Sequence, residues 1–148
     1  FYDYRGVCVW LDADCVTHRK IPRGYVEGHL PPDCYMAHFK RAGYHTETGF
    51  WLMDGRHPEH KAFLDTWVQW FESDRFKQLR QWHDCTTLDA TLRLFERDGR
   101  IRTHNLSGPY AKEMHPLSKV DLGRYVDHCK GGRKALGRSP ENKFREAA

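Results

Sequence analysis

The chain has 148 residues, of which 39% are hydrophobic and 14% aromatic, and this composition predicts a packed core rather than a disordered chain. The length suits one ordinary domain and is short for two. No apolar run approaches the ~18 residues that a membrane-spanning helix needs, so the sequence predicts no membrane span. The net charge of +4 suits an anionic partner, such as a nucleotide diphosphate or a nucleic acid, and equally suits ordinary solubility.

Five cysteines are present, and no two of them form a C-x-x-C pair. The odd number and the spacing argue against a disulfide framework and against a structural zinc finger. We therefore expect a reducing, cytoplasmic compartment. The chain starts with Phe1 and reaches an apolar segment within a few residues, without the pattern of a signal peptide. We expect from this that it starts inside a larger domain.

Apolar segments in the first half of the chain predict β-strands. Residues 7–11 (VCVWL) form a continuous apolar run, which is typical of a strand buried on both faces in a parallel sheet. Residues 34–39 are a weaker candidate, and residues 48–53 alternate clearly before Asp54-Gly55 ends the run. A last strand is predicted at 101–106.

Apolar residues at helical spacing follow from residue 57 onward. A helix is predicted to start near His57-Pro58, and its apolar face consists of Phe63, Trp67, Trp70 and Phe71. Further helices are predicted at 74–82, 86–97 and 120–129, followed by a polar tail at 139–148. Because strands and helices alternate, the predicted class is α/β, with a mixed sheet flanked by helices.

Asp12 and Asp14 directly follow the first predicted strand. Two aspartates separated by one small residue can approach a divalent cation, and Mg²⁺ and Mn²⁺ prefer carboxylate oxygens. Ligand sites of open α/β sheets lie at the carboxyl ends of the strands, which is where this pair is expected. The alternative is that both side chains only make hydrogen bonds within a turn.

A second candidate element is the segment His128-Cys129-Lys130-Gly131-Gly132-Arg133-Lys134. A histidine ring can bind a metal, and glycines let a phosphate approach the backbone. Lys130 and Lys134 can neutralise phosphate charge. The alternative is an ordinary helix end, because cationic residues followed by glycine commonly end helices.

Together the two elements resemble GT-A-fold glycosyltransferases. The run Val9-Trp10-Leu11-Asp12-Ala13-Asp14 is similar to their strand and D-x-D motif. The spacing His128-x-x-Gly131-x-x-Lys134 is similar to the late H-x-x-G-x-x-K element of family 8, which includes glycogenin and related galactosyltransferases. The two elements also occur in the order found in that family.

The resemblance implies the C-terminal portion of a GT-A-like (Rossmann-like) fold, with residues 1–138 forming a partial glycosyltransferase domain that lacks the N-terminal nucleotide-binding part. It further implies that Asp12, Asp14 and His128 bind Mn²⁺ or Mg²⁺, and that Gly131 and Lys134 contact the diphosphate. We add Lys130 to the diphosphate contacts, because its charge lies next to the same element. The reaction implied is the transfer of a sugar from a nucleoside-diphosphate sugar to the hydroxyl of an acceptor.

Glu47 and Asp84 are the candidate catalytic carboxylates. An inverting transferase needs a carboxylate that takes the proton of the acceptor hydroxyl. The alternative for Asp84 is a helix cap before Thr86 and Thr87. If the enzyme retains configuration, as the resemblance to family 8 implies, no such base is required and both residues can orient the acceptor.

Two other classes of function remain open. A metal-dependent nuclease or phosphotransferase would also use Asp12 and Asp14, and its nucleic-acid binding would weaken with salt. A non-catalytic nucleic-acid or protein-binding domain would show no effect of metal on stability. The late H-x-x-G-x-x-K spacing favours the transferase. Trp51 and Trp82 stay open as residues that stack on sugars.

Overall fold

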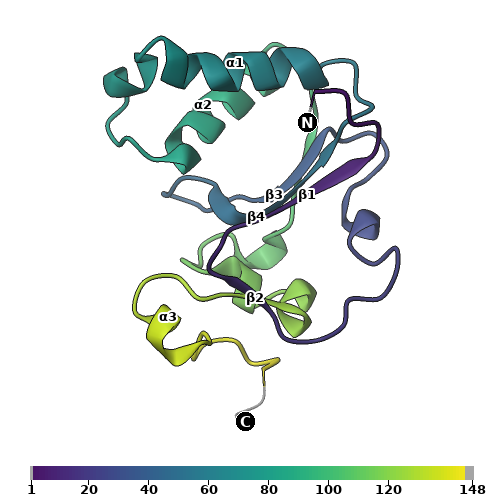
Figure 1. Ribbon diagram of the computed structural model, residues 1–148, viewed down its shortest axis with the longest axis vertical. Coiled ribbons are helices and arrows are strands. Elements are labelled where there is room, and N and C mark those ends of the chain that lie inside the picture. The colour runs from purple at the N-terminus through teal and green to yellow at the C-terminus, as the bar shows by residue number, and fades with distance from the viewer. Residues whose placement is uncertain (1, 146–148) are drawn as a thin grey trace.

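The computed structural model describes residues 2–145 and shows a mixed α/β fold (Figure 1). Its centre is a four-stranded sheet in the order β1-β4-β3-β5. These strands are β1 (Val7–Leu11), β3 (Met36–Phe39), β4 (Glu47–Asp54) and β5 (Thr103–Asn105). β4 is antiparallel to both of its neighbours, and only β3 and β5 run parallel. The sheet is therefore mixed, as predicted, but mostly antiparallel.

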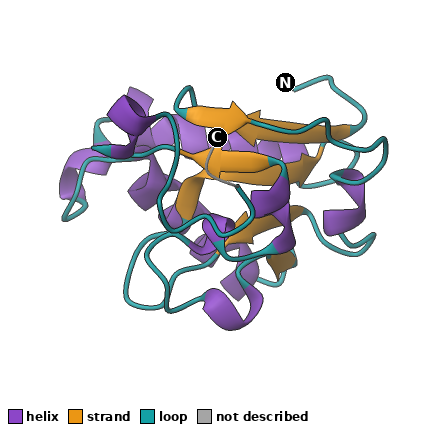
Figure 2. Cartoon of the chain, turned by 90° about the horizontal axis from the view of Figure 1, so that it is seen from below, coloured by secondary structure: helices purple, strands orange, loops and turns teal. Residues whose placement is uncertain are grey.

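Helices α1 (His60–Glu72) and α2 (Asp84–Arg97) cover one face of this sheet. The other side carries the short two-stranded sheet of β2 (Cys15–Thr17) and β6 (Val126–His128) and the short helix α3 (Arg133–Leu136). Viewed from below, this side consists largely of loops and short helices (Figure 2). No helix within residues 2–145 is long and apolar enough to cross a membrane.

β4 organises the core because its side chains alternate between two apolar clusters. Trp51 and Met53 belong to the cluster under α1 and α2, whereas Phe50 and Leu52 belong to the cluster on the opposite face. The first cluster also contains Phe63 from α1 and Leu88, Leu92 and Phe95 from α2. The strand predicted at 48–53 is thus confirmed and extends one residue further at each end. The helices predicted from near His57-Pro58 and at 86–97 are also confirmed, and they start at His60 and Asp84.

β1 differs from the prediction. It is an edge strand paired antiparallel with β4, and Val9, Trp10 and Leu11 are exposed. The apolar side chain of Trp10 is explained by its contact with the neighbouring strand, because its ring stacks on Trp51 of β4 with the centroids 5.6 Å apart. A continuous apolar run does not distinguish a central strand from an edge strand that covers its neighbour with large side chains.

Two predicted helices were wrong. Residues 74–82 contain only a 3₁₀ turn at Arg75–Gln78, because Asp74 adopts a left-handed conformation and Leu79 is extended. Residues 120–129 form a 3₁₀ turn at Asp121–Arg124 and then strand β6. Pairing with β2 determines the second outcome, since all three residues of β6 are buried in that ladder.

The predicted tail also differs. Ser139 is buried, and its backbone N–H donates a hydrogen bond of 2.7 Å to Asp127. The side chain of Asn142 is buried as well and donates to the carbonyl of Gly123 at 3.0 Å. Residues 139–145 are therefore packed against the β6 region, and residues 146–148 lie outside the described part of the chain.

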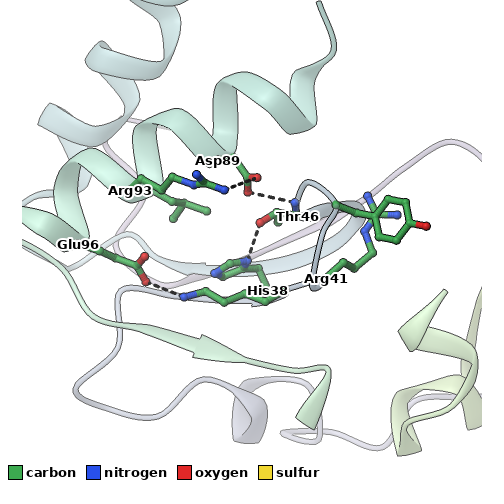
Figure 3. Close-up of a pocket in the computed structure, with 9 residues that line it drawn as sticks. His38, Arg41, Thr46, Asp89, Arg93 and Glu96 are labelled. Carbon is green, nitrogen blue, oxygen red and sulfur yellow. Dashed lines mark hydrogen bonds and ion pairs between the residues drawn. The ribbon is translucent and has the colours of Figure 1, made fainter. Parts of the chain in front are cut away.

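A polar cavity of about 210 Å³ lies between β3 and α2 (Figure 3). His38 lines it and is fully buried, with its Nδ1 hydrogen-bonded to Thr46 at 3.3 Å. Its Nε2 is buried without a hydrogen-bond partner in the described structure. Burial lowers the pKa of His38 to about 4, and the positive charge of Lys40 acts in the same direction. His38 is therefore neutral in the folded protein near pH 7.

We predict that His38 makes the folded state less stable as the pH falls. The pKa of His38 in the unfolded chain is about 6.5, so the unfolded state binds more protons between about pH 6.5 and pH 4. Stability is lost across this window by up to roughly 3 kcal/mol. Urea unfolding of the wild type and of His38→Asn at a series of pH values measures it. The stability difference should shift in favour of the variant toward acid pH, whereas parallel profiles would contradict the prediction.

Candidate metal centre

The turn after β1 brings the two aspartates to the second sheet. The N–H of Asp12 donates to the carbonyl of Gly49 at 3.0 Å, which continues the β1–β4 contact by one residue. The N–H of Cys15 then donates to the carbonyl of Asp12 at 2.9 Å and closes a tight turn. The chain leaves this turn directly as β2. Asp14 therefore lies at the junction of the two sheets.

The register of β2 and β6 places His128 beside Asp14. Cys15 pairs with His128 in this ladder, and the N–H of Cys129 donates to the carbonyl of Asp14 at 2.9 Å. The imidazole Nε2 of His128 lies 2.9 Å from Asp14 Oδ1 and 4.0 Å from Asp12 Oδ2. The two elements that are far apart in the sequence thus form one cluster. We refer to Asp12, Asp14 and His128 as the candidate metal centre.

Glu47 contacts the other nitrogen of the same ring. Its Oε1 lies 3.3 Å from His128 Nδ1 and 3.8 Å from Lys130 Nζ, and its Oε2 lies 3.0 Å from Arg41 Nη1. Glu47 is only 1% exposed. Burial opposes its ionisation, but the hydrogen bond from His128 and the charge of Arg41 outweigh burial and lower the pKa of Glu47 to about 2. It is a buried carboxylate that stays ionised.

The protonated form of His128 is stabilised by its two carboxylate neighbours. Burial by itself lowers the pKa of His128, but the hydrogen bond and the negative charge of Glu47, together with Asp14, raise it above its usual value. For Asp14, burial is again outweighed, here by Lys134 and His128, and its pKa is lowered. Lys134 Nζ lies 3.2 Å from Asp14 Oδ2. The charges therefore alternate along Arg41, Glu47, His128, Asp14 and Lys134.

Gly49 makes room for the imidazole. A Cβ built on Gly49 would lie 2.3 Å from His128 Nδ1 and 2.4 Å from its Cε1, far inside contact distance. Any larger residue at this position in β4 would displace the ring. The carbonyl of Gly49 also accepts the hydrogen bond from Asp12, so this one residue contacts both elements of the centre.

Cys15 is a neighbour of the centre that the sequence patterns missed. Ligand atoms of Asp14, Cys15 and His128 all lie within 4.8 Å of one another. The Cys15 thiol donates to the carbonyl of Gly49 at 3.0 Å, and burial raises its pKa to about 12. The neutral thiol is thus used for a structural hydrogen bond. Its position directly after the D-x-D pair was the available signal.

The remaining predicted residues fall into two groups. In the first group, Lys130 contacts Glu47 and Lys134 contacts Asp14. Gly131 belongs to the same segment, has a left-handed φ of 63°, and has no atom within 4 Å of the position that a side chain would take. Asp84 instead lies exposed in the first turn of α2, where its Oδ1 accepts the N–H of Cys85 at 2.8 Å. His83, rather than Asp84, precedes the helix, and it makes no capping hydrogen bond.

The chain matches no protein-family model, no curated protein and no solved structure. The site offers ligand atoms of Asp14, Cys15 and His128 within 4.8 Å of one another, and Lys134 lies beside Asp14. A carboxylate oxygen of Asp12 lies 4.0 Å from the same ring nitrogen of His128. Hard divalent cations bind such oxygen and nitrogen donors, and the lysines can neutralise an anion next to such a cation.

We predict that Gly49→Ala destabilises the fold by about 1–3 kcal/mol, because the new methyl group overlaps the His128 ring. The control is Gly28→Ala. Gly28 has no neighbouring atom within 4 Å of its side-chain position, so this variant should stay within about 0.5 kcal/mol of the wild type. Denaturant unfolding measures both. Equal stabilities of the two variants would show that His128 is not packed against Gly49.

Proposed function

We propose that this chain carries the metal- and diphosphate-binding part of a nucleotide-sugar glycosyltransferase. The observation that supports it best is the 2.9 Å contact of His128 Nε2 with Asp14 Oδ1, with Asp12 on the same side of the ring. The D-x-D pair and the late H-x-x-G-x-x-K element each resemble the family independently. Their meeting in one place is what a shared metal and diphosphate site requires.

The donor set fits Mn²⁺ or Mg²⁺. Asp12 and Asp14 offer carboxylate oxygens, and His128 offers Nε2 once the proton that it shares with Asp14 has left. A bound cation of this kind would supply a Lewis acid that stabilises the charge growing on a diphosphate leaving group. Cys15 adds a softer donor nearby, but its high pKa and its hydrogen bond to Gly49 favour an accessory role.

Glu47 serves as a positioning residue in this proposal. It is buried, and it is bound by His128, by Arg41 and by the N–H of Gly49 at 3.3 Å, which leaves it poorly placed to reach an acceptor. Metal-binding histidines commonly donate their second N–H to a carboxylate, which sets the tautomer and the orientation of the ring. Glu47 does this at Nδ1 and directs Nε2 toward the aspartates.

Lys134, Lys130 and the backbone at Gly131 are the groups assigned to the diphosphate. Lys134 is more than half exposed while it contacts Asp14, so it can move from this carboxylate to a bound phosphate. Gly131, with its left-handed φ, and Gly132 leave the backbone directly after Lys130 free of side chains. No role in proton transfer is assigned to Glu47, and Asp84 remains a candidate to orient the acceptor from the start of α2.

A metal-dependent nuclease or phosphotransferase is the main alternative. Chemistry with two metals places several carboxylates around a pair of cations. The carboxylate nearest in the network, Glu47, is held by Arg41 and His128. The arrangement therefore agrees better with a centre for one cation than with a two-metal centre. The proposed transferase needs only one cation, so the arrangement favours it over the nuclease.

The first test is the binding of Mn²⁺ measured by isothermal titration calorimetry. We expect the wild type to bind one Mn²⁺ and Asp14→Asn to bind it at least tenfold more weakly, because the amide removes the charged ligand. Asp65→Asn is the matched control, since Asp65 is an exposed carboxylate on α1 that pairs with Lys61. Equal affinity of Asp14→Asn and the wild type would contradict the proposed centre.

The second test concerns Glu47. We predict that Glu47→Gln lowers the affinity for Mn²⁺ by roughly 10-fold or more, because the charge that supports the His128 ring is removed. Glu96→Gln is the control, since Glu96 is a partly buried carboxylate paired with Lys40 away from His128. A Glu47→Gln protein that folds and binds Mn²⁺ like the wild type would show that Glu47 does not orient His128.

A further inference from the structure

A basic cleft of about 650 Å³ opens next to the candidate metal centre. Its charged lining consists of Arg41, Arg80, Arg93 and Lys130, and no aspartate or glutamate is among the described residues that line it. Arg41 and Lys130 also contact Glu47, which in turn contacts His128, so the cleft lies beside the metal centre. Arg80 and Arg93 come from the far wall, which is formed by α2 and the segment before it.

These four cations are only partly neutralised. Arg41 has a close carboxylate in Glu47, whereas Lys130 lies 3.8 Å from that same carboxylate. Arg93 lies 3.9 Å from Asp89 and is largely exposed. Arg80 is exposed and has no ion pair with the residues that the structure describes. The cleft therefore keeps a surplus of positive charge, which is the condition for binding an anion with several charges.

Two exposed aromatic side chains lie in or next to the segments that form the basic cleft. Tyr44 lines the cleft and is 53% exposed. Trp82 lies between Gln81 and His83, which both line the cleft, and it is 64% exposed. Its ring contacts Phe76 only edge-on, with the centroids 6.0 Å apart. Basic grooves with exposed aromatic rings are typical of surfaces that bind single-stranded nucleic acids, where the bases stack and the cations pair with phosphates.

We propose that the basic cleft binds a single-stranded nucleic acid, and that this strand is the acceptor of the transferase. The binding claim stands on the cleft alone, and the acceptor role rests on the proposed function. In the transfer, a hydroxyl oxygen of the strand bonds to the anomeric carbon of the sugar. The bond from that carbon to the diphosphate breaks, and the nucleoside diphosphate leaves with its electron pair and takes up the hydroxyl proton.

The test uses a short fluorescein-labelled oligothymidylate and fluorescence anisotropy, in EDTA so that no metal contributes. We expect binding that weakens with salt. Arg80→Gln and Arg93→Gln should each weaken it several-fold at low salt and reduce the slope of log K against log salt by roughly 0.7 for each phosphate that is no longer neutralised. The control is Arg97→Gln, which lies on α2 like Arg93, since Arg97 is exposed, pairs with Asp98 and does not line the cleft. It should leave both quantities unchanged.

Variants of Trp82 test the contribution of base stacking independently of the contribution of charge. Trp82→Ala should weaken binding by about fivefold or more without changing the salt slope, and Trp82→Tyr should restore most of the affinity. Because Trp82 is exposed, both variants are expected to melt like the wild type. Unaltered binding by Trp82→Ala, or equal losses of affinity in Arg97→Gln and Arg80→Gln, would overturn the proposal. So would binding of inorganic tripolyphosphate without binding of the oligonucleotide, which would indicate a site for small anions.

The same assay, together with the Mn²⁺ titration, distinguishes a failure of the cleft proposal from a failure of the metal-centre proposal. Asp14→Asn should bind the oligonucleotide at least as well as the wild type, because it removes a negative charge near the cleft and none of its cations. A wild type that binds the oligonucleotide and no Mn²⁺ would refute the metal centre and the acceptor role while supporting the cleft. A wild type that binds Mn²⁺ and no oligonucleotide would refute the cleft alone.

Discussion

The candidate metal centre depends on the position of the His128 imidazole, which lies between Glu47 and Asp14. Each ring nitrogen faces a carboxylate, at 3.3 Å and 2.9 Å. Burying a protonated imidazole together with two carboxylates costs free energy unless each charge has a partner of opposite sign. Here Arg41 pairs with Glu47 and Lys134 pairs with Asp14, which completes the network at its two ends. The ring fits only because β4 has a glycine at position 49. Sheet register, glycine and charge network therefore support one another.

Local patterns in the sequence were sufficient for the elements whose side chains alternate or repeat regularly. β4 shows the period of two because it carries a cluster on each face, and α1 and α2 show helical spacing because each buries one side. The D-x-D pair and the late histidine were also identified from spacing. Their proximity, however, was an expectation that only the pairing of Cys15 with His128 could show.

What the patterns missed depends on contacts between distant segments. Residues 126–128 became a strand because β2 offers a partner, although their spacing also suits a helix. Arg41 was not singled out, since nothing in its local sequence indicates that it adjoins Glu47. Cys15 was missed although it directly follows the D-x-D pair, because its contact with Gly49 joins segments that are distant in the sequence. Glu47 was identified as a catalytic candidate from its neighbours in sequence, whereas its burial points to a positioning role.

The central claim is that Asp14 and His128 share one divalent cation. A crystal grown with Mn²⁺ and measured near the manganese absorption edge tests it most directly. The account predicts a single strong anomalous peak about 2.0–2.2 Å from His128 Nε2 and from an oxygen of Asp14, with Glu47 still on Nδ1. A peak bound elsewhere on the chain, or none at saturating Mn²⁺, would contradict it.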